Sequence, residues 1–167
     1  GHKFHAPPGV GVIYSKFLKE LKPIIFGGSQ EYGLRPGTEN LPGIVGIGKA
    51  AELRKNNFSN VASKTKKMRD LFEEQILKAV PNTRINGNLE FRIGSSTNIL
   101  FEGVDGQALV ARLDQIGIRC SQSSACTNMR PEPSYVLRAM GHTKEEAYSS
   151  IRFSFSGFAL WTTGSGR

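Results

Sequence analysis

The stretch TNILFEGVDGQALVARLDQIG, residues 97–117, decides the fold class of this chain. Its first five residues, 97–101, are mostly apolar or β-branched and predict a strand. Asp105 can accept hydrogen bonds from the free N–H groups of a helix start, and Gly117 suits the position just after a helix end. The stretch therefore predicts a strand followed by a helix over residues 106–115, which is typical of the α/β class.

Further elements follow toward the C-terminus. Residues 118–120 predict another strand, and residues 134–140 predict a short helix. Thr143 and Glu146 have the spacing of a capping box, in which two side chains satisfy backbone N–H groups at a helix start. Residues 150–155 alternate polar and apolar side chains, as a half-buried strand does. Together these elements predict a small α/β unit in the second half of the chain.

A long helical pattern precedes this unit. Apolar residues recur at steps of three and four between residues 42 and 79, and Asn56 with Asn57 predicts a break or a kink in that helix. Residues 10–14, VGVIY, are apolar and β-branched, which predicts a buried strand near the start of the chain. Residues 27–38 are too rich in Gly and Pro for a regular element, and loops of this length inside a domain are often functional.

Composition places the chain among ordinary globular proteins. Of its 167 residues, 38% are hydrophobic and 22% are charged, which is enough apolar material for a core. The net charge is +8, and part of the excess lies in residues 64–67, KTKK. A solvated helix face explains such a run most simply, whereas nucleic-acid binding and an acidic protein partner are the alternatives. No zinc-ligand spacing or aromatic-rich RNA-binding strand accompanies the charge, so we expect no nucleic-acid partner.

The two cysteines, Cys120 and Cys126, are too few for a secreted disulfide scaffold. They favour a reducing compartment: the cytoplasm, or the mitochondrion in a eukaryote. Two thiols without a matching set of histidines predict no structural metal site. No apolar run reaches transmembrane length, so no membrane is expected as a partner.

Two side chains are candidate nucleophiles. Lys3 follows His2 and precedes a predicted strand, and a lysine that forms a Schiff base needs a rigid position and a neutral amine. Cys126 lies among small polar residues before a Pro-rich turn, with Arg119 and Arg130 near in sequence. Accessible thiols near positive charge have a lowered pKa and react as nucleophiles. A charged chain end and an inert exposed cysteine remain the plain alternatives.

Cys120 and Arg152 are less distinctive. Cys120 falls in a predicted strand and is interpreted as a small buried hydrophobe. Arg152 lies in the alternating strand, where its side chain points either into a cleft or into water, and the alternating pattern alone favours water. In a cleft, its planar guanidinium could bind a carboxylate through two hydrogen bonds.

Five motifs in this order resemble the cysteine desulfurases, pyridoxal-phosphate-dependent enzymes of the class V aminotransferase type that supply sulfur for iron–sulfur clusters. The motifs are Gly1–Lys3, Gly27–Thr38, Ser123–Thr127, Glu132–Gly141 and Ser149–Ser154. The likeness runs from residue 1 to about Phe155. It implies the C-terminal part of a PLP-dependent transferase fold. Residues 1–60 would be a remnant of the large PLP-binding domain with the start of a connecting helix, and residues 61–167 a small C-terminal α/β domain that carries the catalytic-cysteine loop.

The resemblance also implies a role for each of five residues. Lys3 corresponds to the catalytic lysine that holds pyridoxal 5'-phosphate covalently, and His2 to a histidine that contacts the cofactor phosphate. Thr38 corresponds to a threonine that reaches the phosphate in the neighbouring subunit, which implies a homodimer. Cys126 corresponds to the catalytic cysteine that becomes a persulfide, and Arg152 to the arginine that binds the substrate carboxylate.

The implied reaction converts L-cysteine to L-alanine and passes the sulfur to an acceptor or iron–sulfur scaffold protein. Two alternatives stay open at this point: a selenocysteine lyase of the same family, and a non-catalytic basic binding module. The family's aspartate under the pyridine nitrogen and its ring-stacking histidine have no counterpart here. We therefore expect this chain alone to bind the cofactor poorly and to be inactive. After Phe155 the sequence departs from the family pattern.

Overall fold

The computed structural model describes residues 1–122 and 132–157. The chain divides into two compact units, Gly1–Phe58 and Ser59–Arg167, and each is described by itself. The helix α1 (Leu41–Ala79) contributes residues to both units. The interpretation of the two parts as a cofactor-domain remnant and a small domain rests on the resemblance and stays a prediction.

The first unit is built mainly from turns and loops. It contains the 3-10 helices η1 (His2–Phe4), η2 (Leu18–Glu20) and η3 (Glu31–Gly33), followed by the start of α1. The prediction of a buried strand over residues 10–14 is wrong, because Val12, Ile13 and Tyr14 are 76%, 81% and 83% exposed. A strand needs a neighbour for its N–H and C=O groups, and none of the three strands in the described residues pairs with this segment.

The helix α1 runs without interruption over 39 residues, so the prediction of a break at Asn56 and Asn57 is wrong, whereas a kink there stays a prediction. The boundary between the two units falls next to these residues, at Phe58 and Ser59. The Asn57 side chain donates a hydrogen bond to the carbonyl of Leu53, 3.1 Å away and one turn earlier. This bond leaves the backbone helical, because it engages the side chain without displacing the N–H groups of the helix. Asparagine lowers helix propensity by less than about 0.7 kcal/mol, which the rest of a long helix offsets.

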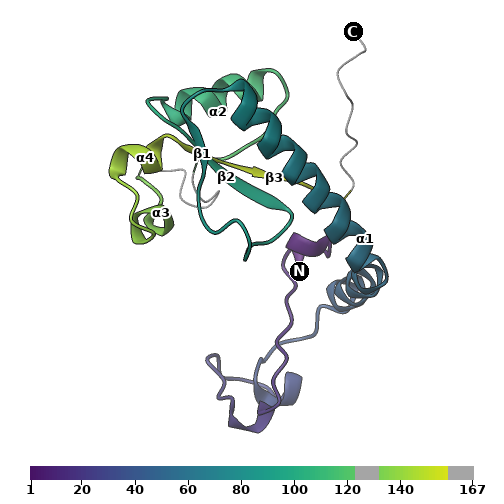
Figure 1. The fold of residues 1–167 in the computed structure, drawn as a ribbon. Helices are drawn as coiled ribbons and strands as arrows, with labels where there is room; N and C mark the ends of the chain where they lie inside the picture. Colours follow the sequence, from purple (N-terminus) through teal and green to yellow (C-terminus); the bar gives the residue numbers. More distant parts are fainter. Residues whose placement is uncertain (123–131, 158–167) are drawn as a thin grey trace. The chain divides into compact units, whose positions relative to one another are not determined.

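Three antiparallel strands form the sheet of the second unit, in the order β1 (Thr83–Ile85), β2 (Ser96–Phe101) and β3 (Ser150–Ser154) (Figure 1). The strands predicted at residues 97–101 and 150–155 are confirmed. The prediction that a strand begins at residues 118–120 is wrong, because these residues have no strand pairing. The next residue, Ser121, makes an isolated bridge with Arg152. The strand β1 was not predicted, because three residues are too few to show an alternating pattern.

One face of the sheet carries the hydrophobic core. Its buried members are Ile99, Phe101, Ile151 and Phe153. Side chains of α1 and of α2 (Gly106–Gln115) cover this cluster, and the ring of Phe72 lies 4.8 Å from that of Phe153. Burial of each such side chain is worth about 1.5–3 kcal/mol, so this face holds the unit together.

Three short helices of the second unit begin where the sequence predicts. Asp105 accepts hydrogen bonds from the N–H groups of Gln107 and Ala108, at 2.9 and 3.2 Å, and so caps α2. Ser134 caps α3 (Tyr135–Ala139). Each cap is worth about 1 kcal/mol and needs only residues within one turn.

The helix α4 (Lys144–Tyr148) begins with the predicted capping box. The N–H of Glu146 donates to Thr143 Oγ1 at 3.1 Å, and the N–H of Thr143 donates back to Glu146 Oε2 at 2.9 Å. The bond from Thr143 holds the pKa of Glu146 below its ordinary value, with further help from Arg84 and His142. Glu146 therefore stays ionised and keeps α4 capped at neutral pH.

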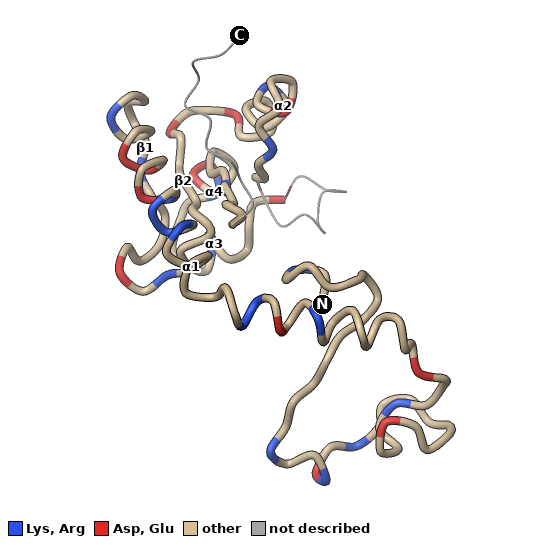
Figure 2. Tube along the Cα trace, turned by 90° about the vertical axis from the view of Figure 1, so that its right-hand side faces the viewer, with Lys and Arg blue, Asp and Glu red and all other residues tan. Residues whose placement is uncertain are grey.

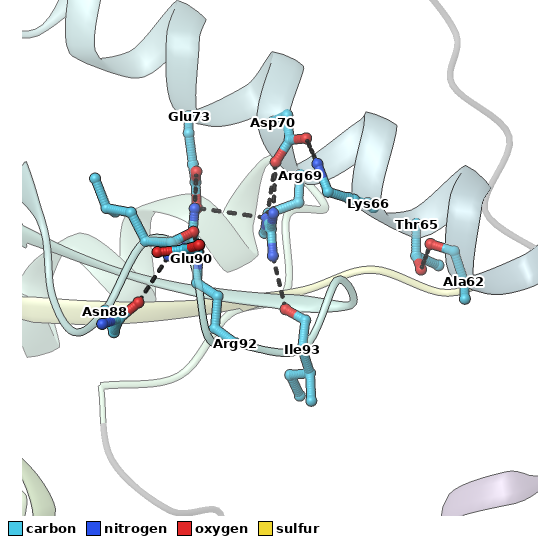
Figure 3. Close-up of polar contacts among 11 residues, drawn as sticks. Ala62, Thr65, Lys66, Arg69, Asp70, Glu73, Asn88, Glu90, Arg92 and Ile93 are labelled. Atoms are coloured by element: carbon cyan, nitrogen blue, oxygen red, sulfur yellow. Dashed lines mark hydrogen bonds and ion pairs between the residues drawn. The ribbon is translucent and has the colours of Figure 1, made fainter.

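A buried ion-pair network fixes the β1–β2 connection to α1 (Figure 3). Arg92 donates to both carboxylate oxygens of Glu73, each at 2.6 Å, and Glu73 is only 5% exposed. Arg69, which is 3% exposed, donates to the carbonyl of Ile93 at 2.8 Å and to Asp70 at 2.6 Å. Arg69 and Glu73 of α1 thus hold the β1–β2 connection, which has no regular structure, against the helix.

We expect Glu73→Ala to destabilise the full-length protein by about 3–5 kcal/mol, because it leaves a buried guanidinium without its carboxylate. The measurement is the free energy of unfolding in urea. Glu74→Ala is the matched control, since Glu74 is exposed and its ion pair with Lys78 lies on the surface. It should leave the stability nearly unchanged. A Glu73→Ala protein as stable as the Glu74→Ala protein would contradict the structural role of the network.

Positive charge along α1 is partly paired with nearby acidic groups and carbonyls. Figure 2 shows Lys and Arg interspersed with Asp and Glu along this helix. Lys66 of the KTKK run pairs with Asp70 at 2.6 Å, and Lys64 donates to the carbonyl of Gly157 at 2.9 Å. These contacts favour a solvated helix face as the explanation of the run. None of the helices that the structure describes is long and apolar enough for a membrane span.

Candidate active site

The predicted site residues fall in separate parts of the molecule. His2 and Lys3 share the turn η1 of the first unit, and Thr38 lies in the loop before α1 of the same unit. Arg152 lies in β3 of the second unit. Cys126 lies outside the described residues. The structure therefore brings His2 and Lys3 together in one turn, and it supports the other roles only through their local surroundings.

Lys3 is held through its backbone. The N–H groups of Phe4 and Ala6 both donate to the carbonyl of Gly1, at 3.1 and 3.3 Å, and His5 closes the turn in a left-handed conformation with φ 73°. The side chains of His2 and Lys3 are exposed. The turn thus fixes the backbone position of Lys3, and the exposed amine of its side chain is accessible to a ligand.

Thr38 follows a loop with its own internal hydrogen bonds. The N–H of Gly37 donates to Gln30 Oε1 at 3.2 Å, and the N–H of Gly33 donates to the carbonyl of Ser29 at 3.0 Å. Gly37 has φ 100°, a conformation that side-chain-bearing residues rarely adopt. The loop therefore has a defined shape that presents the exposed hydroxyl of Thr38.

These three side chains fit the cofactor that the resemblance implies. They supply a primary amine, an imidazole and a hydroxyl, all exposed within the first unit. An aldehyde requires the amine, and a phosphate accepts hydrogen bonds from the other two groups. Across residues 1–122 and 132–157, no three His, Cys, Asp or Glu side chains are arranged to hold a metal ion.

Arg152 occupies the sheet face opposite the core. Its backbone pairs with Ser121 through two hydrogen bonds, of 2.7 and 3.1 Å, and it lies opposite Asn98 of β2. The side chain is half-buried. Its guanidinium has no hydrogen bond or ion pair with any described residue. A half-buried cation that pairs with no described residue would be stabilised by an anionic ligand, and the role of this arginine in a cleft stays a prediction.

Three polar residues beside Arg152 were missed in the sequence. Asn86, which is 9% exposed, donates through Nδ2 to Asn98 Oδ1 at 2.6 Å and to Ser150 Oγ at 2.9 Å. Ser150 is fully buried and donates to the carbonyl of Glu146 at 2.7 Å. The only sequence signal was the polar Asn98 inside the otherwise apolar run 97–101.

Cys120 is unlike a catalytic thiol. It packs against the hydrophobic core cluster, and burial, with a smaller effect of Asp114, raises the pKa of its thiol. A raised pKa lowers the fraction of reactive thiolate at neutral pH. The interpretation of Cys120 as a small hydrophobe agrees with these surroundings.

A cavity of about 530 Å³ lies between the start of α2 and the end of α4. Its lining includes Asp105, Gln122, Glu145 and Tyr148, and the Gln122 amide donates to the carbonyl of Tyr148. A Cβ atom at Gly106 would collide with that carbonyl, so only glycine allows the helix to start so close. Among the predicted site residues that the structure describes, His2, Lys3, Thr38 and Arg152, none lines this cavity.

The comparisons with known proteins agree on one family. The Aminotransferase class-V model matches residues 1–159. A cysteine desulfurase from Nostoc sp. is 44% identical over 154 residues, which are 92% of this chain and 38% of the relative. The cysteine desulfurase NifS of Azotobacter vinelandii is 40% identical over 156 residues, 93% of this chain and 39% of the relative. The chain thus spans about two fifths of the length of these relatives.

Solved structures show the same likeness. A NifS-like protein superposes with a TM-score of 0.82 and 32% identity, over 95% of this chain and 40% of its own. A NifS-like protein from Rickettsia africae superposes with a TM-score of 0.71 and 37% identity, over 83% of this chain and 36% of its own. The mixed α/β arrangement is therefore that of part of a NifS-like protein.

Proposed function

Because this chain belongs to the aminotransferase class-V family, we propose that it is part of a pyridoxal-phosphate-dependent cysteine desulfurase. The observation that carries the proposal is the 44% identity, over 92% of the chain, to a protein named cysteine desulfurase. The proposed site residues, His2, Lys3, Thr38, Cys126 and Arg152, all fall within the residues that the family model matches.

Lys3 and His2 would bind the cofactor. The Lys3 amine, held by the η1 turn, would attach to the aldehyde and later move the proton at the substrate Cα. His2 would donate a hydrogen bond to the phosphate. When bound, pyridoxal phosphate supplies an electron sink for the charge that develops at the substrate carbon.

Arg152 would orient the substrate by its carboxylate. The half-buried guanidinium without a partner among the described residues supports this role. Two parallel hydrogen bonds fix the direction of a carboxylate as well as its position. The amino acid would then present its sulfur in one orientation only.

Cys126 would accept the sulfur. Its thiolate attacks the substrate sulfur, an S–S bond forms, the C–S bond breaks, and the carbon takes up a proton. L-Cysteine and a thiol thus become L-alanine and a persulfide, with no external oxidant. The persulfide would pass its outer sulfur to an acceptor or to an iron–sulfur scaffold protein.

Thr38 supports a dimeric arrangement. We propose that its hydroxyl reaches the cofactor phosphate of a second copy, so that each site needs two chains. The defined loop shape that presents Thr38 at the surface is consistent with contact to a partner.

The test is product analysis with the full-length protein, pyridoxal phosphate, a reductant and L-cysteine. We expect equal amounts of alanine and sulfide. A parallel reaction with L-selenocysteine distinguishes the lyase alternative, which predicts turnover of that substrate and little of L-cysteine. A colourless protein that forms no alanine from either substrate would overturn the proposal.

A further inference from the structure

A row of polar residues crosses the sheet of the second unit. Asn86 donates its backbone N–H to the carbonyl of Asn98 at 2.8 Å, Asn98 lies opposite Arg152, and Arg152 bridges to Ser121. Residues directly opposite each other in antiparallel strands point their side chains to the same face. The core residue Ile151 is the neighbour of Arg152 in β3, and neighbouring residues of a strand point to opposite faces. The row therefore lies on the face away from the core.

Hydrogen bonding fixes the orientation of the Asn98 side chain. The Ser150 hydroxyl donates to the carbonyl of Glu146 at 2.7 Å, so its oxygen must accept from Asn86. The group that reaches Ser150 is therefore the amide nitrogen of Asn86, and its second hydrogen points to Asn98 Oδ1 at 2.6 Å. Asn86 thus holds the Asn98 oxygen, and the Asn98 amide nitrogen is left as a donor on the sheet face that carries Arg152.

The hydrogen bonds from Asn98 through Asn86 and Ser150 to the Glu146 carbonyl, called the relay below, can run in only one direction. Asn86 Oδ1 is buried and has no partner among the described residues. If Asn86 were turned over, its oxygen would face the Asn98 oxygen and the Ser150 oxygen, both already acceptors. The Glu146 carbonyl of α4 thus determines, through Ser150 and Asn86, which end of the Asn98 amide is held and which is left for another acceptor.

Two neighbouring hydrogen-bond donors of the row have no acceptor among the described residues. Neither the amide nitrogen of Asn98 nor the guanidinium of Arg152 donates to any residue that the structure describes, and both side chains are half-buried. Partly buried donors are stabilised by an acceptor, and a carboxylate has two oxygens that accept several hydrogen bonds. Directly opposed side chains lie about 5 Å apart at Cβ, a spacing that one carboxylate can bridge.

We propose that Asn98 is a second binding residue for the substrate carboxylate, beside Arg152, and that Ser150 and Asn86 are positioning residues that hold its amide nitrogen toward the substrate. This inference rests on the proposed function of Arg152. It also assigns a specificity: the pair recognises a free carboxylate, and an ester or amide of cysteine would leave one donor without an acceptor.

The test is Asn98→Asp in the full-length protein. Aspartate keeps an oxygen for Asn86 and nearly the same shape, but it replaces the donor with an anion that pairs with Arg152 and repels the substrate. We expect KM for L-cysteine to rise by about 10- to 100-fold, with kcat within about threefold of wild type, because the lost bonds involve a charged group. Asn88→Asp is the matched control. Asn88 accepts from the N–H groups of Glu90 and Phe91, a role that aspartate keeps, so KM should not change.

Two further variants keep the outcome decisive. Asn98→Ser removes the amide nitrogen without adding charge and should raise KM even if Asn98→Asp fails to fold. Ser150→Ala should raise KM by about twofold to tenfold. It removes the hydroxyl that orients Asn86, and so loosens the Asn98 side chain, but it removes no donor to the substrate. An unchanged KM in Asn98→Asp and Asn98→Ser would overturn the inference. The proposed function fails separately, if the wild-type protein forms no alanine from L-cysteine.

Discussion

Cys126→Ala is expected to reduce sulfide release from L-cysteine by at least about a thousandfold while the protein still binds the cofactor, because removing a nucleophile eliminates a step that nothing else performs. Yellow colour should persist, since the side chain that holds the cofactor is a different one. The measurement pairs sulfide release with the visible spectrum. Mass analysis of the wild-type protein after reaction should find one extra sulfur atom on the peptide that contains Cys126.

Cys120→Ala is the matched control. This thiol packs against the core and its pKa is raised by burial, so it should not take part in the reaction. We expect its alanine variant to release sulfide at nearly the wild-type rate. If Cys126→Ala kept full activity, or if the extra sulfur were found on Cys120, the assignment of the sulfur acceptor would be wrong.

Lys3→Ala should remove both the yellow colour and the activity, with a loss of turnover of at least about a thousandfold, because the same amine is proposed to hold the cofactor and to move the proton at Cα. Lys3→Arg tests whether a positive charge at this position is sufficient or whether a neutral amine is needed. Arginine keeps the positive charge, but its pKa above about 12 leaves no neutral amine at working pH. Both variants should therefore be colourless and inactive.

Lys19→Ala provides the comparison in the same unit. Lys19 lies in η2 and is exposed, so its loss removes an equal charge without touching the proposed site. It should remain yellow and active. A yellow, active Lys3→Arg protein would show that a positive charge is all that position 3 contributes, and it would contradict the role of its amine.

The fold was predictable where the deciding contacts are close in sequence. The start of α2 follows from Asp105, which bonds to residues two and three positions later. The capping box of α4 joins Thr143 and Glu146 in the same way. The residues in these bonds are never more than three apart, so the amino-acid pattern contains all the information.

The site was predictable in part. The identities of its five residues came from the motifs, and their roles stay predictions. The surroundings of Arg152 could not be read from the alternating pattern, which by itself favoured a side chain in water. The half-buried position arises because β3 lies between β2 and the bridge at Ser121, a residue 31 positions earlier in the chain.

Similar apolar patterns had different outcomes in two segments. Residues 97–101 pair with strands on both sides, whereas residues 10–14 have no paired strand among the described residues and lie exposed. Local sequence thus accounts for the helix starts, whereas an apolar, β-branched run alone does not decide whether a strand forms. Strand pairing and the Asn86–Asn98–Arg152 row arose only in the folded chain, because a strand's backbone groups and opposed side chains find their partners far away in sequence.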